Sequence, residues 1–348
     1  MATLQASRLY RASVVNLVPT VTACLLIGFV AERTWWTMFL LYLAPVTYIA
    51  PSLALLIAAL IRRNRSAAIL ALASAAIVVG GIMKPVVTVA GRRHPAGNTV
   101  RVMQYNVEKW ATGASRIAEV IRGINPDVVC LEEADNYWYT QPGATQLAKL
   151  LPDYHWAHEN EIVIGTKYPI LSERVYHIQP DEPTRPTPAL EIDVHGASVI
   201  VLATHLMPVP WGAPATWQKL GEQRRTEIGN LVALQSRLNI PWILCGDFNM
   251  PADGLAFRAL TRYANSAFDR SGLGFGYTLS AAVPVERVDH IFTDRSITPQ
   301  RTWVPNIVES DHRPLVSELS IRGCSCRDLK AESGMLPRDE YMGRVATW

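Results

Sequence analysis

Polar residues of the kinds that bind metal ions and phosphate stand at the ends of apolar, strand-like runs in this sequence of 348 residues. Carboxylate and amide oxygens are the ligands that hard divalent cations prefer, and histidine can accept or donate a proton near neutral pH. Together they provide what hydrolysis of a phosphate ester by an activated water requires. The six segments are Tyr105-Asn106-Val107, Leu131-Glu132-Glu133, Ala203-Thr204-His205, Gly246-Asp247-Phe248-Asn249, Val288-Asp289-His290 and Ser310-Asp311-His312.

Each segment taken alone has an ordinary structural explanation. An Asp-x-Asn sequence is commonly a turn or a helix cap, and an Asp-His pair is commonly part of a surface loop. Six polar strand ends in one stretch of chain are poorly explained by turns and caps. Because sheet ends hold side chains on rigid supports, we expect these residues to meet at one site.

The elements that must position these residues alternate between strand-like and helical patterns. Residues 114–125 and 218–239 carry apolar residues at helical spacing, whereas the other apolar runs are short and rich in Val and Ile. Such a mixture predicts an α/β domain with sheets covered by helices. The predicted strands are Val100–Val107, Asp127–Glu132, Glu161–Thr166, Leu190–Val194, Ser198–Thr204, Trp242–Cys245, Val288–Thr293 and Leu315–Ile321.

In this order the six segments resemble the motifs of the endonuclease/exonuclease/phosphatase superfamily. Gly-Asp-Phe-Asn and Ser-Asp-His are the most specific marks, and residues 162–170 are similar to a recurring family segment. The resemblance covers about residues 99–321 and implies a four-layer α/β/β/α sandwich of two packed mixed sheets. The superfamily includes pancreatic-type deoxyribonucleases, abasic-site endonucleases, neutral sphingomyelinases and inositol-polyphosphate phosphatases.

The resemblance implies a Mg²⁺ site, for which Mn²⁺ is the alternative ion. Glu133 would be the principal ligand, Asn106 would hold the assembly of metal and phosphate, and Asp311 would complete it. Glu132 competes with Glu133 for the metal. We prefer Glu133 because it matches the acid in the family's Leu-Gln-Glu.

The resemblance also assigns catalytic roles. His312 would be the general base for the attacking water, oriented by Asp289, and Asp247 would orient or help to activate that water. Asn249 would bind the phosphoryl oxygens, and His205 would donate a proton or hydrogen bond to the phosphate or leaving group. Whether Asp247 or His312 takes the proton stays open at this stage.

Other polar residues near these segments have structural explanations. His290 follows Asp289 directly, so in a strand it faces the opposite side. Arg224 and Arg225 could reach a substrate, but we expect them to lie on a solvated helix face. Cys130 and Cys245 lie in apolar runs and are expected in the core.

Three apolar stretches precede this domain: Val14 to Ala31, Trp35 to Ile61 and Ala67 to Val89. Each reaches or approaches the roughly 20 residues that a helix needs to cross about 30 Å of hydrocarbon. Pro45 and Pro51 are expected to kink the second stretch. A buried bundle in a soluble protein is the alternative, and the scarcity of charge over such lengths disfavours it.

The basic residues indicate an orientation in the membrane. The cluster Arg62-Arg63-Asn64-Arg65 connects the second and third stretches, and basic loops favour the cytoplasmic side. The large domain would then lie outside the cytoplasm. Arg92 and Arg93, on the opposite side of the third stretch, weigh against this orientation.

The predicted organisation has four parts. It consists of a membrane segment at 1–91 with about three transmembrane helices, a linker at 92–98, a catalytic domain at 99–321 and a polar tail at 322–348. The tail contains Cys324 and Cys326, a weak signal for metal or redox chemistry.

Charge separates the two halves of the chain. Residues 1–95 hold nine Lys or Arg and one acid, which leaves 24 basic and 29 acidic residues, a net charge of −5, for the remainder. A mildly acidic domain beside a bilayer suits a phospholipid headgroup better than a polyanion such as DNA, although a small basic groove could still serve a nuclease. The other alternative is a non-catalytic membrane scaffold. Trp211 and Trp217 could touch lipid or sugar, or pack internally.

Overall fold

The computed structural model describes residues 2–88, 98–134, 143–179, 185–209 and 212–321. These residues form two compact units. The first contains the described residues of Met1–Pro85, Pro210–Gly221 and Pro251–Arg258, and the second contains the others. The polar tail with Cys324 and Cys326, most of the predicted linker and Trp211 lie outside the described residues.

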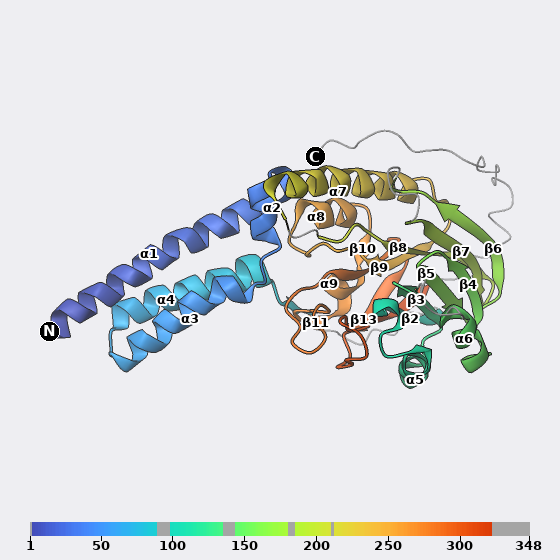
Figure 1. Ribbon diagram of the computed structural model, residues 1–348, viewed down its shortest axis with the longest axis horizontal. Coiled ribbons are helices and arrows are strands. Elements are labelled where there is room, and N and C mark those ends of the chain that lie inside the picture. Colours follow the sequence, from blue (N-terminus) through green and yellow to red (C-terminus); the bar gives the residue numbers. More distant parts are fainter. Residues whose placement is uncertain (1, 89–97, 135–142, 180–184, 210–211, 322–348) are drawn as a thin grey trace. The chain divides into compact units, whose positions relative to one another are not determined.

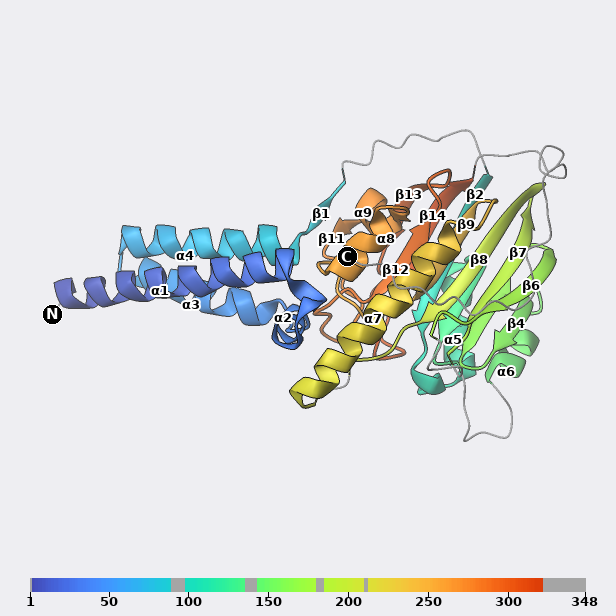
Figure 2. The same ribbon diagram turned by 90° about the horizontal axis from the view of Figure 1, so that it is seen from above.

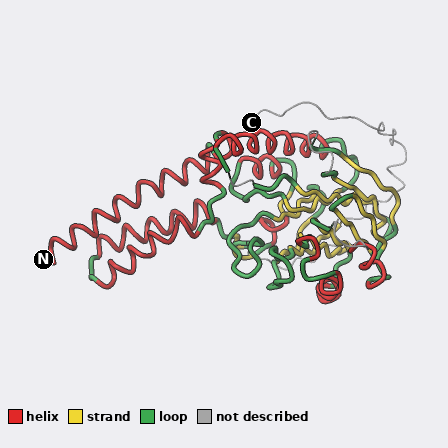
Figure 3. Tube along the Cα trace, in the orientation of Figure 1, coloured by secondary structure: helices red, strands yellow, loops and turns green. Residues whose placement is uncertain are grey.

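The first of these units is built from apolar helices. The helices of residues 8–29 and 65–83, with mean hydropathies of 1.9 and 2.2, are long and apolar enough to cross a membrane. A third span requires that α2 and α3, which meet at an angle of 63°, count as one. Figure 3 shows these residues as helix with short connections. The helices are α1 (Ala2–Phe29), α2 (Trp35–Leu41), α3 (Val46–Ile61) and α4 (Arg65–Val78), which continues as a π-helical turn (Val79–Met83).

The bend in the second apolar stretch lies next to a proline. Helix α2 ends at Leu41, and Pro45 is the residue that precedes α3. Proline cannot donate the backbone hydrogen bond that a continuous helix would need there. Pro51 lies inside α3 without ending it, so only the first of the two prolines coincides with the break.

Glu32 joins two distant segments within the first unit. This side chain is 2% exposed, and its carboxylate accepts the backbone N–H groups of Leu255 at 2.8 Å and Ala256 at 3.3 Å. Both residues open helix α8 (Leu255–Thr261), whose first N–H groups have no partner inside the helix. Trp217 is buried in the same unit against Phe39, so its role there is packing.

Two six-stranded mixed sheets pack face to face in the second unit (Figures 1 and 2). The first has the order β13-β14-β2-β3-β5-β4 and the second β10-β12-β9-β8-β7-β6. The strands are β2 (Asn98–Asn106), β3 (Val128–Glu132), β4 (His155–Glu159), β5 (Ile162–Thr166), β6 (Ile170–Tyr176), β7 (Thr187–Val194), β8 (Ala197–His205), β9 (Trp242–Asp247), β10 (Asn265–Ser266), β12 (Asp289–Thr293), β13 (Thr298–Trp303) and β14 (Leu315–Ile321).

Helices cover the outer faces of the two sheets. Helices α5 (Ala114–Ile124) and α6 (Gly143–Leu150) bury Ile117, Ile121 and Leu147 against the first sheet. The second sheet is covered by α7 (Pro214–Gln235), whose Ile228 and Leu231 are buried. This is the predicted four-layer α/β/β/α sandwich, so the fold class is confirmed.

The core between the sheets consists mainly of alternate strand residues. Val102 and Cys130 from the first sheet and Val201 and Cys245 from the second belong to one buried cluster. The expectation that both cysteines lie in the core is therefore confirmed.

Several elements were not predicted because their sequences carry little apolar periodicity. Strand β6 is an edge strand, and its central residues Ser172-Glu173-Arg174 are polar and largely exposed. Strand β4 is the edge of the other sheet and begins with the exposed His155. Several short elements were not predicted either. They are the 3₁₀ turns Ala31–Arg33 and Glu108–Trp110, α9 (Ala267–Ser271), and the strand pair β1 (Val86–Val87) with β11 (Leu273–Gly274).

Strand register brings the polar strand ends together. Strands β2 and β3 are parallel, with Asn106 opposite Glu132, and β8 and β9 are parallel, with His205 opposite Asp247. Strand β12 runs antiparallel to β9 and places Asp289 opposite Asp247. The polar residues at these strand ends are therefore held at one end of the sandwich, where Asn106 bonds to Asp247.

Strands β8 and β9 approach so closely at Gly246 that a larger residue there should destabilise the fold. A Cβ atom at this position would lie 1.9 Å from the backbone oxygen of Thr204, which cannot move without disturbing the strand pair. We expect Gly246→Ala to lower the free energy of unfolding by about 1–3 kcal/mol, as overpacking does. Chemical unfolding of the full chain in detergent measures this change.

Gly123→Ala is the matched control for that substitution. Gly123 lies in α5, and a Cβ atom there would meet nothing within 4 Å. Alanine favours the helix by about 0.5–1 kcal/mol over glycine, so this variant should be slightly more stable than the wild type. Equal effects of the two variants would contradict the argument from close strand packing.

Candidate active site

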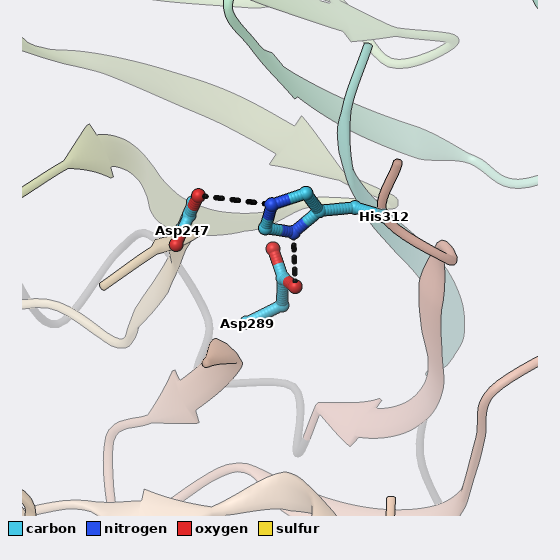
Figure 4. A group of neighbouring side chains, drawn as sticks. All are labelled: Asp247, Asp289 and His312. Carbon is cyan, nitrogen blue, oxygen red and sulfur yellow. Dashed lines mark hydrogen bonds and ion pairs between the residues drawn. The ribbon is translucent and has the colours of Figure 1, made fainter. Parts of the chain in front are cut away.

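His312 and Asp289 form a buried hydrogen-bonded pair. Asp289 is the first residue of β12 and is fully buried, and His312 lies just before β14 and is 5% exposed. Nδ1 of His312 lies 2.8 Å from Oδ2 of Asp289 (Figure 4). Because the carboxylate holds Nδ1 as a donor, Nε2 is the ring nitrogen that can exchange a proton.

Asp247 lies at the centre of the cluster. Its Oδ2 atom is 3.7 Å from Nε2 of His312 (Figure 4) and 3.8 Å from Nε2 of His205. The same oxygen accepts a hydrogen bond of 3.1 Å from Nδ2 of Asn106, and Oδ1 accepts the backbone N–H of Asn249 at 2.8 Å. Residues from three strands and two loops therefore meet at one carboxylate.

The two neighbouring glutamates have different surroundings. Glu133 is partly exposed and adopts a φ of 50°, and its Oε1 accepts a hydrogen bond of 3.2 Å from Nδ2 of Asn106. Glu132 is fully buried and bonds to Gln104 instead. Burial raises the pKa of Glu132 well above its usual value, with nearby acidic groups adding to the effect. Only Glu133 combines access to solvent with a contact to Asn106.

His205 is held by a charged pair on its other side. Nδ1 of His205 and Nη1 of Arg185 each lie 3.1 Å from Oε1 of Glu161. Burial alone would raise the pKa of Glu161, but the hydrogen bond from His205 and the charges of His205 and Arg185 lower it overall. Nε2 of His205 is buried without a hydrogen bond to any described residue and lies on the side of Asp247.

Asn249 is held in place by α7. Its φ is 46°, and its Nδ2 donates to the backbone oxygen of Leu206 at 3.1 Å. Arg224 donates to the backbone oxygens of Asn249 at 3.1 Å and Met207 at 2.6 Å, and it pairs with Glu227. The expectation that Arg224 lies on a solvated helix face is wrong, because the side chain is fully buried in this role. Sequence periodicity alone does not reveal backbone carbonyls that need a donor.

Asp311 lies beside the cluster in an exposed position. Its carboxylate accepts a hydrogen bond from Oγ of Ser310 at 3.2 Å, and its N–H donates to Glu108 at 3.0 Å. Oγ of Ser310 also donates to the backbone oxygen of Asn106 at 2.8 Å, which ties this loop to the end of β2. The described contacts of Asp311 do not reach Glu133, and its part in a metal site stays a prediction.

His290 is separate from the cluster. It is buried, its Nε2 lies 3.0 Å from the backbone oxygen of Met250, and its ring packs against Phe248 and Phe292. Burial lowers the pKa of His290 to about 3, with the charge of Arg287 acting in the same direction. As its place in the strand predicted, His290 faces away from Asp289 and has a structural role.

The carboxylates around His312 change its affinity for protons. Burial alone would lower its pKa, but the charges of Asp289 and Asp247 and the hydrogen bond to Asp289 raise it from 6.5 to about 10. The imidazole therefore holds a proton at neutral pH when no cation is bound. A bound cation would offset the negative charge and bring the pKa closer to the range that suits a general base.

The donors in this cluster fit a divalent cation. Ligand atoms of Asp247, Asp289 and His312 lie within 4.8 Å of one another. Oδ2 of Asp289 and Nδ1 of His312 bond to each other, whereas Asp247 and Glu133 each present a carboxylate oxygen to Nδ2 of Asn106. Such an oxygen-rich set is the kind that Mg²⁺ prefers.

Comparison with known proteins identifies the family. The model of the Endonuclease/Exonuclease/phosphatase family matches residues 103–312, more than half of the chain. The chain belongs to this family. Its description names nucleases and phosphatases, which hydrolyse phosphoester bonds, so the predicted enzyme class is confirmed at the level of the family. Enzymes of this family typically depend on a divalent metal, which agrees with the buried Asp and His cluster.

Solved structures of family proteins share the fold. One from Bacteroides thetaiotaomicron is 15% identical, covers 65% of this chain and 99% of its own, and has a TM-score of 0.55. Another from Beutenbergia cavernae is 21% identical, with coverages of 65% and 72% and a TM-score of 0.53. A mannosyl-6-phosphatase from B. thetaiotaomicron is 15% identical, with coverages of 64% and 100% and a TM-score of 0.53. No curated protein matches the chain.

Three residues that sequence reasoning missed touch the site of this family member. Gln104 bonds to Asp289, and Glu161 and Arg185 support His205. Gln104 lies inside a strand, Glu161 precedes one directly and Arg185 lies shortly before another, so no motif marked them. The usable signal was a polar side chain in the apolar run of β2 at Gln104, which a buried partner would explain.

The raised pKa of His312 predicts how stability depends on pH in the metal-free protein. The unfolded chain releases this proton near pH 6.5 and the folded chain near pH 10, so the stabilisation is complete below pH 6.5 and is lost as the pH rises to about 10. The difference in free energy of unfolding between wild type and His312→Gln should shrink over this window by a few kcal/mol, on the order that the shift implies. Urea unfolding with EDTA at several pH values measures it.

His290→Gln is the control for this pH series. The pKa of His290 is lowered, so its contribution changes below pH 6.5 and is constant above it. A difference between His312→Gln and wild type that stays constant from pH 6.5 to 10 would show that His312 is not protonated in the folded chain.

Proposed function

We propose that this chain is a membrane-anchored, Mg²⁺-dependent phosphoesterase that hydrolyses phosphodiester or phosphomonoester bonds. The observation that carries the proposal is the meeting of Asn106, Glu133 and Asp247 beside the Asp289–His312 pair. A hydrolase of this kind needs an activated water, a cation site and donors for the phosphoryl oxygens, and no covalent nucleophile.

Water activation is assigned to His312. Its Nε2 would take the proton of the attacking water while Asp289 keeps Nδ1 protonated and stabilises the imidazolium. Asp247 would orient the same water, because its Oδ2 lies 3.7 Å from that nitrogen. As the water oxygen bonds to phosphorus, the bond from phosphorus to the leaving oxygen breaks, and His205 would give that oxygen a proton or hydrogen bond. Asn249 would bind the phosphoryl oxygens.

Mg²⁺ would be held by Glu133 and Asn106, with Asp311 completing the site and Mn²⁺ as the alternative ion. When bound, the cation neutralises charge on the phosphoryl group and makes phosphorus more open to attack. Glu132 is disfavoured as the ligand because it is fully buried and bonded to Gln104.

Membrane anchoring is proposed from the composition and length of the N-terminal helices. Two helices, or three with the bent pair, are apolar enough to span a bilayer. The basic cluster at residues 62–65 connects α3 to the first residue of α4 and favours the cytoplasmic side, which would put the catalytic domain outside.

A substrate at the bilayer surface fits this arrangement. The part of the chain after residue 95 has a net charge of −5, which does not favour a long polyanion, whereas a phospholipid or sphingolipid headgroup carries a single phosphate. The similar structure of a mannosyl-6-phosphatase supports a phosphomonoester as the alternative substrate class.

Removal of the metal or of its ligand tests the proposed chemistry. We expect the full chain in detergent to hydrolyse an aryl phosphodiester with Mg²⁺ and to lose this activity with EDTA. His312→Ala and Asp247→Ala should lower kcat by at least about 100-fold, the usual effect of losing a general base. Glu133→Gln should weaken Mg²⁺ binding by about 10-fold or more, on the order of the effect of losing a ligand's support, whereas Glu132→Gln should bind Mg²⁺ like the wild type. Kinetics and calorimetric Mg²⁺ titration measure these effects.

Several outcomes would contradict the proposal. Full activity of His312→Ala or Asp247→Ala would contradict the assigned mechanism. A loss of Mg²⁺ affinity confined to Glu132→Gln would show that Glu132 is the metal ligand and Glu133 is not. Mg²⁺ binding without hydrolysis of any phosphate ester would favour a scaffold. Comparing sphingomyelin vesicles, plasmid DNA and inositol phosphates on one preparation would decide between lipid, nucleic-acid and soluble substrates.

Reporter fusions test the proposed anchoring and sidedness. A fluorescent protein that matures only in the cytoplasm should be active when fused after Arg63, and an alkaline phosphatase that folds only outside should be active after Thr88. Both fusions should pellet with membranes and resist extraction at alkaline pH. The reverse pattern would invert the orientation, and soluble fusions would exclude the anchor.

A further inference from the structure

A series of buried hydrogen bonds continues behind the Asp289–His312 pair. Nε2 of Gln104 donates to Oδ1 of Asp289 at 2.7 Å and to Oε2 of Glu132 at 2.9 Å. Gln104, Glu132 and Asp289 are fully buried, and His312 is nearly so. The order of the series is therefore His312, Asp289, Gln104 and Glu132.

Gln104 donates to the carboxylate oxygen of Asp289 that does not bond to His312. Oδ2 of Asp289 lies against Nδ1 of His312, and Oδ1 accepts from Gln104. A carboxylate held at one oxygen can still rotate about its last side-chain bond, whereas one held at both oxygens cannot. The plane of the Asp289 carboxylate, and with it the direction in which His312 is held, is thus fixed from two sides.

The bond between Gln104 and Asp289 connects the two sheets. Gln104 belongs to β2 of the first sheet and Asp289 to β12 of the second. His312 precedes β14, the neighbour of β2, so the pair itself also draws on both sheets. The hydrogen bond from Gln104 to Asp289 therefore fixes the position of one sheet relative to the other next to the Asp289–His312 pair.

Glu132 in turn holds the carboxamide of Gln104. The two residues lie on the parallel neighbours β2 and β3, and the two hydrogens of Nε2 go to two different carboxyl groups. One oxygen of each, Oε1 of Gln104 and Oε1 of Glu132, is buried without a hydrogen bond to a described residue. Incomplete pairing of buried polar groups costs stability, and an apolar pair would fill this space without that cost.

We propose that Gln104 is a positioning residue of the Asp289–His312 pair, and that Glu132 holds Gln104 in the orientation this requires. The inference rests on the proposed function, since it concerns the alignment of His312 toward the attacking water. Gln104 lies behind Asp289 and acts through it, so it touches neither the substrate nor the cation.

Substitution of Gln104 tests the proposal. Gln104→Leu keeps a similar size but removes both donors, and we expect kcat to fall about 10- to 100-fold, as loss of such supporting hydrogen bonds does. KM for the aryl phosphodiester should stay within a factor of about two because no substrate contact is lost. Gln104→Glu, which matches the shape but cannot donate two hydrogens, should also lower kcat. It serves as the second variant if Gln104→Leu does not fold.

A double-mutant cycle separates positioning from general weakening of the fold. If Gln104 acts through Asp289, adding Gln104→Leu to Asp289→Ala should lower kcat by less than about two-fold more. A loss of about 10- to 100-fold in both backgrounds, or no loss in the wild-type background, would overturn the proposal. Thr302→Val is the control, because Thr302 is buried and bonded to Ala267, Ser271 and Ser317 away from the site. It should lower Tm and leave kcat unchanged.

Proton NMR provides a readout that does not require activity. The Nδ1–H proton of His312 should give a strongly deshielded resonance, identified by its loss in His312→Ala. It should be unchanged in Thr302→Val and shift in Gln104→Leu. If the wild type hydrolyses no phosphate ester while the resonance shifts in this way, the proposed function fails and the positioning role stands. An active enzyme whose resonance and kcat are both unchanged by Gln104→Leu would show that the positioning role is wrong.

Discussion

The parallel pairing of β2 with β3 and of β8 with β9 is the constraint on which the site depends. Each pair ends in register, so Asn106 lies beside Glu132 and His205 beside Asp247. In the second pair the backbones approach so closely that only glycine fits opposite Thr204. Packing of the two sheets then brings one end of each pair to the same place, where residues far apart in the chain, such as Asn106 and Asp247, can touch.

The electrostatic character of the site follows from this crowding. Carboxylates from three strands and a turn converge where burial makes unpaired negative charge costly. Part of the charge is balanced within the protein, because Asn106 bridges Glu133 and Asp247 and His312 accepts a proton between two aspartates. A divalent cation would balance the remainder, which is why the donor set and the high pKa of His312 support the same metal-dependent chemistry.

The sequence predicted those parts of the site that stand at the ends of apolar runs. Asp247 and Asp289 adjoin strongly apolar strands, so both the strand and the polar residue at its end were visible in the sequence. Gln104 was missed, and Arg224 was wrongly expected on a solvated face. The role of each depends on hydrogen-bond partners far along the chain, which no periodic pattern in the sequence reveals. The edge strands β4 and β6 were missed for a related reason: one side of an edge strand lacks a neighbour, and exposed residues there need not be apolar. The boundaries predicted for the domains stay predictions.

Glu32 connects the apolar N-terminal region to a helix that lies much later in the chain. Its carboxylate serves as the cap for the start of α8, although 223 positions separate Glu32 from Leu255 along the chain. A shortened protein that began at residue 98 would keep every residue named in the site and still lose this cap. The N-terminal residues therefore contribute to the start of a helix that lies late in the chain, and a fragment without them would differ from the full chain in its folded interior.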